Sequence, residues 1–277
     1  MKQEKAAFAS NIVVMPAQVS DMPEIIAMFL EDGQNPYGWG QEKYEHYYHD
    51  YSEGAPVSLV AKHQGKIVGH YGLLPVKIGC KGKQWLALLG LHTYVSHAHR
   101  GRKILSLLFE AVEKNCQSRG AVAFLVFGNL NITRMYERYG CKTVAWLGFG
   151  KNFAYSASDD EMERFRFIYS SAWYGWRFGK KRNIYVSRYV DSSGMIRKQL
   201  LKCSPDFSGF EWSKLESCEV WAPNEMFCEE QFGRFCQPFT VKAFSEEVIK
   251  EGIYETGKWC LDMGDSDTFQ YVPWESE

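Results

Sequence analysis

Apolar residues recur along the first half of the chain in two alternating rhythms, one typical of strands and one typical of helices. Alternating or continuous apolar runs predict strands over 11–16, 57–62, 66–76, 85–95, 121–127 and 142–148. The turn His63-Gln64-Gly65-Lys66 predicts a hairpin between the second and third of these strands. Apolar residues three or four apart predict helices that start near residues 20, 41, 102 and 132. The order β-α-α-β-β-β-α-β-α-β indicates a mixed sheet with helices on both faces, within one α/β unit of about 150 residues.

The pattern changes after the last of these strands. A polar and acidic run, 156–163, predicts a linker. The elements predicted beyond it are strands over 183–190, 195–202 and 256–263 and a helix over 245–252. Asp191-Ser192-Ser193-Gly194 predicts a hairpin turn between the first two of these strands. We therefore predict one domain at 1–155 and a smaller C-terminal α+β domain at 165–277.

Composition narrows the class of protein. Apolar residues make up 45% and charged residues 23%, which is typical of a folded protein. The formal net charge is −1, so the chain does not have the strongly positive charge that is typical of proteins that bind nucleic acids. No apolar run approaches the ~20 residues of a membrane span, and the N-terminus lacks the apolar region of a secretory signal. We expect a cytoplasmic protein with neither nucleic-acid nor membrane partners.

The cysteines favour the same compartment. All eight are scattered, with no C-x-x-C pair: Cys80, Cys116, Cys141, Cys203, Cys218, Cys228, Cys236 and Cys260. This spacing does not support a zinc ribbon or a thioredoxin-type motif. We expect reduced, mostly buried thiols and no bound metal.

The stretch 89–141 carries the candidate chemistry. Its predicted strand runs into Arg100-Gly101-Arg102-Lys103, which leads into a helix, so a basic loop precedes a helix N-terminus. Backbone N–H groups and the positive end of the helix dipole favour a phosphate there. A pyrophosphate is expected on the amides of 101–106, which include those of Ile104 and Leu105, with the Ser106 hydroxyl as a further donor.

Two motifs stand at a defined spacing in this stretch. The first is VSHAHRGRKIL at 95–105, and the second places Asn129, Tyr136 and Gly140 along NLNITRMYERYGC. Together they resemble the motifs of the GCN5-related N-acetyltransferase (GNAT) family, in which acetyl-CoA donates its acetyl group to an amine. The resemblance covers roughly 11–150 as a fold and is specific over 89–141. It implies a GNAT-like, mostly antiparallel sheet flanked by helices, with acetyl-CoA as donor substrate.

The resemblance also implies direct transfer within a ternary complex. Tyr136 occupies the family's general-acid position; the alternative is a tyrosine packed in the core. His92 stands where the family often has a glutamate base. An imidazole with an ordinary pKa of about 6.5 can accept a proton near neutral pH. The alternative is a hydrogen-bonded strand histidine with no catalytic part.

The remaining implied contacts hold the donor. The backbone of Thr93, Tyr94 and Val95 should pair with the pantetheine arm as an added strand would. Asn129 should hydrogen-bond that arm, unless it only caps a helix. Lys103 and Leu105 replace small residues of the family pattern. Lys103 either adds charge toward the phosphates or points to solvent, and Leu105 either crowds the site or faces the core.

The second half carries a weaker resemblance. Trp176-Arg177-Phe178 is similar to an element of larger GNAT members that carry a partial second copy of the fold. Taken together, the sequence predicts an acyl-CoA-dependent N-acyltransferase that moves acetyl to a primary amine of a small molecule. The alternative is a weak or inactive module that binds acyl-CoA as a sensor or scaffold. The expected partners are acyl-CoA and an amine acceptor; the sequence does not fix the oligomeric state, for which a homodimer is the commonest assembly.

Overall fold

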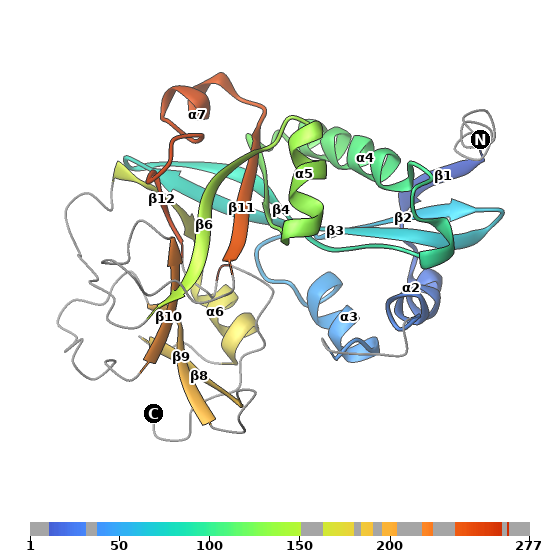
Figure 1. The fold of residues 1–277 in the computed structure, drawn as a ribbon, viewed down its shortest axis with the longest axis horizontal. Helices are drawn as coiled ribbons and strands as arrows, with labels where there is room; N and C mark the ends of the chain where they lie inside the picture. Colours follow the sequence, from blue (N-terminus) through green and yellow to red (C-terminus); the bar gives the residue numbers. More distant parts are fainter. Residues whose placement is uncertain are drawn as a thin grey trace. The chain divides into compact units, whose positions relative to one another are not determined.

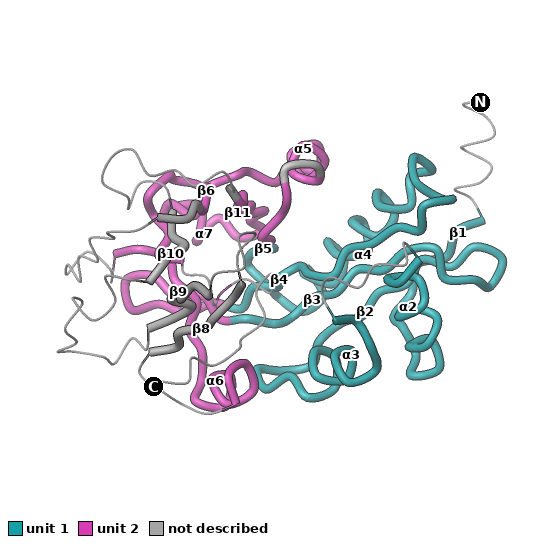
Figure 2. Tube along the Cα trace, turned by 60° about the horizontal axis from the view of Figure 1, so that its bottom comes forward, with its two compact units in different colours: residues 1–76, 86–124 teal, residues 77–85, 125–277 magenta. Residues whose placement is uncertain are grey.

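The computed structural model describes residues 11–31, 38–150, 163–179, 184–190, 196–203, 218–223, 236–261 and 265. The chain divides into two compact units, coloured separately in Figure 2: residues 1–76 and 86–124 form unit 1, and residues 77–85 and 125–277 form unit 2. Three strands contribute residues to both units: β3 (Lys66–Cys80), β4 (Lys83–Val95) and β5 (Ala123–Phe127). This division differs from the domains expected at 1–155 and 165–277, which stay a prediction.

Unit 1 follows the predicted order of strands and helices (Figure 1). Besides the shared strands it contains β1 (Ile12–Pro16), η1 (Val19–Asp21), α2 (Met22–Phe29), α3 (Gln41–Tyr48), β2 (Val57–His63), η2 (His97–His99) and α4 (Ile104–Ser118). The strand order is β1-β2-β3-β4-β5, with β2 antiparallel to β1 and β3. The hairpin predicted between β2 and β3 is confirmed. Its turn residues Gln64 and Gly65 have φ of 51° and 81°, the positive values that a tight hairpin turn requires.

Helices cover both faces of the unit 1 sheet, as predicted. α4 contacts β1 and β2 through the apolar face expected from its spacing: Ile104, Leu108, Phe109, Val112 and Cys116 are buried. On β3, a methyl group added to Gly69 would lie 2.8 Å from Ile104 Cγ2, so the helix requires a glycine there. The other face carries α2 and α3, whose Ile25, Met28, Phe29 and Tyr44 form one buried cluster with Val60 of β2 and Ile67 of β3.

Unit 2 also consists of strands and short helices. Its elements are α5 (Leu130–Arg138), β6 (Lys142–Gly150), β7 (Phe165–Ile168), α6 (Ser171–Phe178), β8 (Ile184–Val190), β9 (Ile196–Cys203), β10 (Cys218–Pro223), β11 (Cys236–Ala243), α7 (Glu246–Lys250) and β12 (Trp259–Cys260). The strand order is β5-β11-β6-β10-β9-β8. β6 is antiparallel to both neighbours, whereas β9 and β10 are parallel. The expected α+β fold with a mostly antiparallel sheet flanked by helices is confirmed.

The predictions for the second half are confirmed in part. β8 and β9 match the strands expected at 183–190 and 195–202, and α7 matches the later helix. The strand expected over 256–263 is only Trp259–Cys260 among the described residues, because the chain turns at Gly252 and Gly257, whose φ values are 88° and 78°. The turn expected at 191–194 and most of the expected linker lie outside the described residues.

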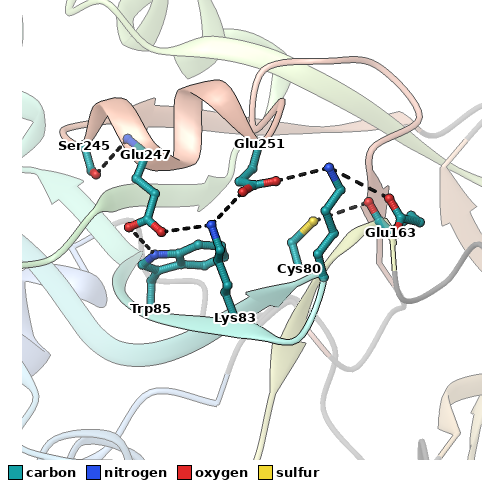
Figure 3. A network of polar contacts seen from close by, with 8 residues as sticks. Cys80, Lys83, Trp85, Glu163, Ser245, Glu247 and Glu251 are labelled. Atoms are coloured by element: carbon teal, nitrogen blue, oxygen red, sulfur yellow. Dashed lines mark hydrogen bonds and ion pairs between the residues drawn. The ribbon is translucent and has the colours of Figure 1, made fainter.

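An ion-pair network in unit 2 joins the β3–β4 hairpin to α7 (Figure 3). Lys83 Nζ lies 3.2 Å from Glu247 Oε1 and 2.8 Å from Glu251 Oε1. Lys81 Nζ lies 3.1 Å from Glu251 Oε2. The indole N–H of Trp85 donates to Glu247 Oε2 over 3.1 Å. Glu247 of α7 and Glu251, the residue that follows this helix, therefore hold Lys81 and Lys83 of the hairpin.

Candidate active site

The basic loop reaches α4 through two left-handed backbone positions. Gly101 has a φ of 74° and Lys103, the N-cap residue of α4, has a φ of 65°. Glycine adopts this conformation readily, whereas a lysine pays about 1–2 kcal/mol for it. Lys103 therefore keeps the bend that glycine makes easily, and its side chain is exposed. This exposure agrees with the solvent-facing alternative for Lys103.

The first turn of α4 presents its amides at the end of this loop. The first intrahelical bond runs from Leu107 N to Lys103 O over 3.2 Å, so the amides of 104–106 precede the helical ladder. Ile104 is 1% exposed, and Leu105 and Ser106 are half-buried. Amides at a helix N-terminus, beside exposed Arg102 and Lys103, suit a phosphate group.

A carboxylate from another helix braces the loop. Glu31, just beyond α2, accepts from Ser96 Oγ over 3.0 Å and from the His97 amide over 3.1 Å. Arg100 Nε donates to Val95 O over 3.1 Å, and its guanidinium lies 5.4 Å from the centre of the Tyr94 ring. The loop after β4 is thus held by defined bonds. Sequence reasoning missed Glu31, which no local motif marks.

His92 interrupts β4 with a φ of 50°. Its Nδ1 lies 3.0 Å from the Tyr48 hydroxyl. The rings of Trp39 and Tyr47 meet its imidazole edge-on, with centroids 4.4 and 4.6 Å away. The candidate base is therefore half-buried in an aromatic setting, which the sequence analysis did not anticipate. The residues that follow it, 93–95, are half-buried as well.

A buried polar chain lies behind His92. His70 is in β3 and is fully buried. Its Nδ1 lies 2.8 Å from the His92 carbonyl oxygen, and its Nε2 lies 2.9 Å from Ser58 Oγ. Tyr44 donates its hydroxyl to Ser58 Oγ over 3.0 Å. Burial lowers the pKa of His70 to about 4, so its imidazole is neutral near pH 7.

The other two candidates lie in unit 2. Asn129 Oδ1 accepts from the Ile132 amide over 3.1 Å, so Asn129 caps α5, the alternative role considered for it. Tyr136, on the same helix, is 1% exposed. A contact between Asn129 and pantetheine, and an acid role for Tyr136, stay predictions. The structure thus places His92, 93–95 and 100–106 in unit 1, and Asn129 and Tyr136 in unit 2.

Comparison with models of known protein families identifies the family of this part of the chain. The sequence model of the Acetyltransferase (GNAT) family matches residues 24–141. This segment is a GNAT acetyltransferase domain. The GNAT match covers α2 to α5 and includes every candidate residue named above. A search of curated protein sequences finds no significant match.

Solved structures show the same fold. A GCN5-related N-acetyltransferase from Kribbella flavida is 9% identical, with a TM-score of 0.56 over 85% of this chain and 72% of that one. A probable N-acyltransferase from Enterococcus faecalis is also 9% identical, with a TM-score of 0.56 over 84% of this chain and 72% of that one. Both matches extend well beyond the GNAT domain, so the shared fold continues into the second half of the chain.

Two further properties concern only the part of the chain that the structure describes. No group of three or more His, Cys, Asp or Glu side chains there is arranged to hold a metal ion. No helix there is long and apolar enough to cross a membrane.

Proposed function

We propose that the protein transfers an acyl group, in the simplest case acetyl, from acyl-CoA to a primary amine of a small molecule. One observation carries the proposal: a basic loop with left-handed backbone at Gly101 and Lys103 leads into the N-terminus of α4 within a GNAT domain. Such an N-terminus favours an anion such as the pyrophosphate of CoA.

The donor would lie along unit 1. The amides of 101–106 would hold the pyrophosphate, with Ser106 as a further donor and the side chains of Arg100, Arg102 and Lys103 as neighbouring positive charges. The backbone of 93–95 would hydrogen-bond the pantetheine arm. Asn129 would contribute to the same arm. Each of these groups lies inside the GNAT match at 24–141.

The chemical step follows from the two candidate proton carriers. His92 removes a proton from the acceptor ammonium, and the amine then attacks the thioester carbonyl carbon to form a C–N bond. The positively charged nitrogen of the tetrahedral intermediate then loses its second proton to solvent, and collapse of the intermediate breaks the C–S bond. Tyr136 gives its proton to the leaving thiolate, and the products are an amide and CoA. Both proton carriers return to their starting states through solvent.

The test is release of free thiol from acetyl-CoA in the presence of a panel of amino acids, polyamines, amino sugars and aminoglycosides. His92→Gln should lower kcat about 100-fold or more, and Tyr136→Phe should lower kcat without weakening acetyl-CoA binding. His49→Gln, at an exposed position at the end of α3, should leave the rate unchanged. Absence of any thermal stabilisation by millimolar acyl-CoA would overturn the proposal.

The burial of Tyr136 favours a second candidate, a GNAT module that binds acyl-CoA without turnover. A phenol that is 1% exposed leaves little of its surface open to a leaving thiolate. Binding of acetyl-CoA in calorimetry, without thiol release across the amine panel, would favour this sensor or scaffold. The variant Lys103→Gly separates donor binding from the chemical step. If this variant binds acetyl-CoA more tightly and still shows no turnover, the result also favours the binding module.

A further inference from the structure

The hydrogen-bond directions behind His92 can be assigned without ambiguity. A carbonyl oxygen only accepts, so His70 Nδ1 must carry the proton that it donates to His92 O. A neutral imidazole then has its lone pair on Nε2. The Ser58 hydroxyl therefore donates to His70 Nε2 and accepts from the Tyr44 hydroxyl, as the Tyr44 bond requires. The chain runs in one direction, from Tyr44 through Ser58 and His70 to the His92 carbonyl.

This row of hydrogen bonds ends at His92, the one residue of β4 whose backbone is in the left-handed conformation. A non-glycine residue with a φ of 50° persists only when its surroundings hold it there. The His92 carbonyl is held by a side chain that is itself fully buried and fixed at both ring nitrogens. His70 thus lies where it can set the backbone from which the candidate base projects.

The imidazole of His92 is held from the other side. Tyr48 reaches its Nδ1 from α3 over 3.0 Å, while the rings of Trp39 and Tyr47 flank it. With Nδ1 bonded to Tyr48, the role of proton acceptor falls to Nε2. A basic Nε2 requires the proton on Nδ1, donated to the Tyr48 oxygen, as in other sites where a base is oriented by a third group.

We propose that His70 and Tyr48 are positioning residues for His92: His70 holds its left-handed backbone, and Tyr48 holds its imidazole with Nε2 as the basic nitrogen. This inference rests on the proposed acyltransferase function, in which His92 is the base. It adds two side chains from β3 and α3 that the motif at 95–105 does not contain.

The first test needs no substrate. Long-range proton–nitrogen spectra of protein labelled with ¹⁵N-histidine report which ring nitrogen carries the proton. His70 and His92 are assigned by the signals lost in His70→Asn and His92→Gln. Both residues should show the Nδ1–H form near neutral pH. An Nε2–H form for either residue would overturn the inference.

The second test uses two substitutions of His70 that keep different halves of the ring. The amide nitrogen of asparagine reaches the place of Nδ1, so His70→Asn keeps the donor to His92 O. The amide of glutamine reaches the place of Nε2, so His70→Gln keeps the contact with Ser58 and loses that donor. With acetyl-CoA and the amine found in the panel, His70→Asn should retain kcat within about threefold, whereas His70→Gln should lower it about 100-fold with an unchanged KM for acetyl-CoA.

Tyr48→Phe removes the bond to Nδ1 and keeps the ring. It should lower kcat about tenfold and move the acid limb of the pH–rate profile, which loss of packing alone would not do. Equal kcat values for the two His70 variants, at equal melting temperatures, would overturn the positioning role. If both His70 variants unfold, the tautomer of His92, assigned through His92→Gln, and the pH–rate profile of Tyr48→Phe decide. If the protein releases thiol from acetyl-CoA but either histidine has the Nε2–H form, this inference is refuted and the proposed function is not. If both histidines have the Nδ1–H form but the protein binds no acyl-CoA, the proposed function is refuted.

Discussion

Acid should destabilise the protein through His70. Burial lowers the pKa of this imidazole from 6.5 to about 4, against a smaller raising effect of its bond to the His92 carbonyl. The unfolded chain therefore binds a proton near pH 6.5, whereas the folded protein binds it only near pH 4. Stability rises with pH wherever the unfolded state holds more protons. The contribution of neutral His70 is therefore complete above the unfolded pKa and is lost as pH falls toward the folded pKa.

The size of this contribution follows from the two pKa values. The difference between 6.5 and about 4 corresponds to about 3 kcal/mol over the whole window. About 2 kcal/mol of it should be lost between about pH 7 and about pH 4.5. With a urea m-value of about 2 kcal/mol/M, the unfolding midpoint should fall by about 1 M.

The assay is urea unfolding, followed by circular dichroism, at about pH 7 and about pH 4.5. His70→Asn should be less stable than the wild type at neutral pH. Because asparagine does not titrate, the urea midpoint of this variant should fall by about 1 M less in acid than that of the wild type. His49→Asn, at an exposed position, controls for the loss of a histidine as such and should keep the wild-type acid response. An acid-induced shift of equal size in the wild type and His70→Asn would refute the reasoning that His70 is buried and neutral.

Three further predictions concern packing and charge. Gly90→Ala should destabilise by about 1–3 kcal/mol in urea unfolding, because the new Cβ would lie 2.6 Å from Phe124 Cε2; a change below the error of the fit would contradict the packing. Gly175→Ala should stabilise by about 0.5–1 kcal/mol, because Gly175 is in α6 with no atom within 4 Å of the added methyl; a loss of stability would count against it. Glu251→Gln should lower the melting temperature more than Glu247→Gln, because Glu251 contacts two lysines and is 17% exposed against 51%. This difference should shrink in high salt, and an unchanged difference would argue against an electrostatic origin.

Local pattern was sufficient to predict most elements of the fold. The apolar spacing of 102–119 predicted α4 because one face of that helix must meet a sheet. Gln64-Gly65 predicted a hairpin because a tight turn needs residues that accept positive φ. The strand expected from residue 256 begins only at Trp259, because the turn at Gly257 could not be separated by pattern from the aromatic residue that follows it.

The candidate site was predictable only where it is contiguous in sequence. The loop at 95–106 combines strand, glycine and helix start in one motif. Glu31 lies 65 residues from Ser96, and His70 lies 22 residues from His92; no periodicity links such pairs. One signal for His70 was present, since it is the polar residue within an otherwise apolar run of β3, and a buried polar group needs a partner. The cytoplasmic location and the homodimer stay predictions.

The end of β3 has a consequence for anyone who shortens this protein to its family match. The last residues of β3 pair with β7: Lys77 with Ile168, Ile78 with Phe167 and Gly79 with Arg166. The hairpin that follows forms ion pairs with Glu247 and Glu251. A chain cut at residue 141 would keep the complete GNAT motif but strip those partners away, leaving a bare strand edge of the kind that recruits other molecules and aggregates. Insolubility of such a fragment would report on a missing neighbour and would say nothing about whether the motif can bind its donor.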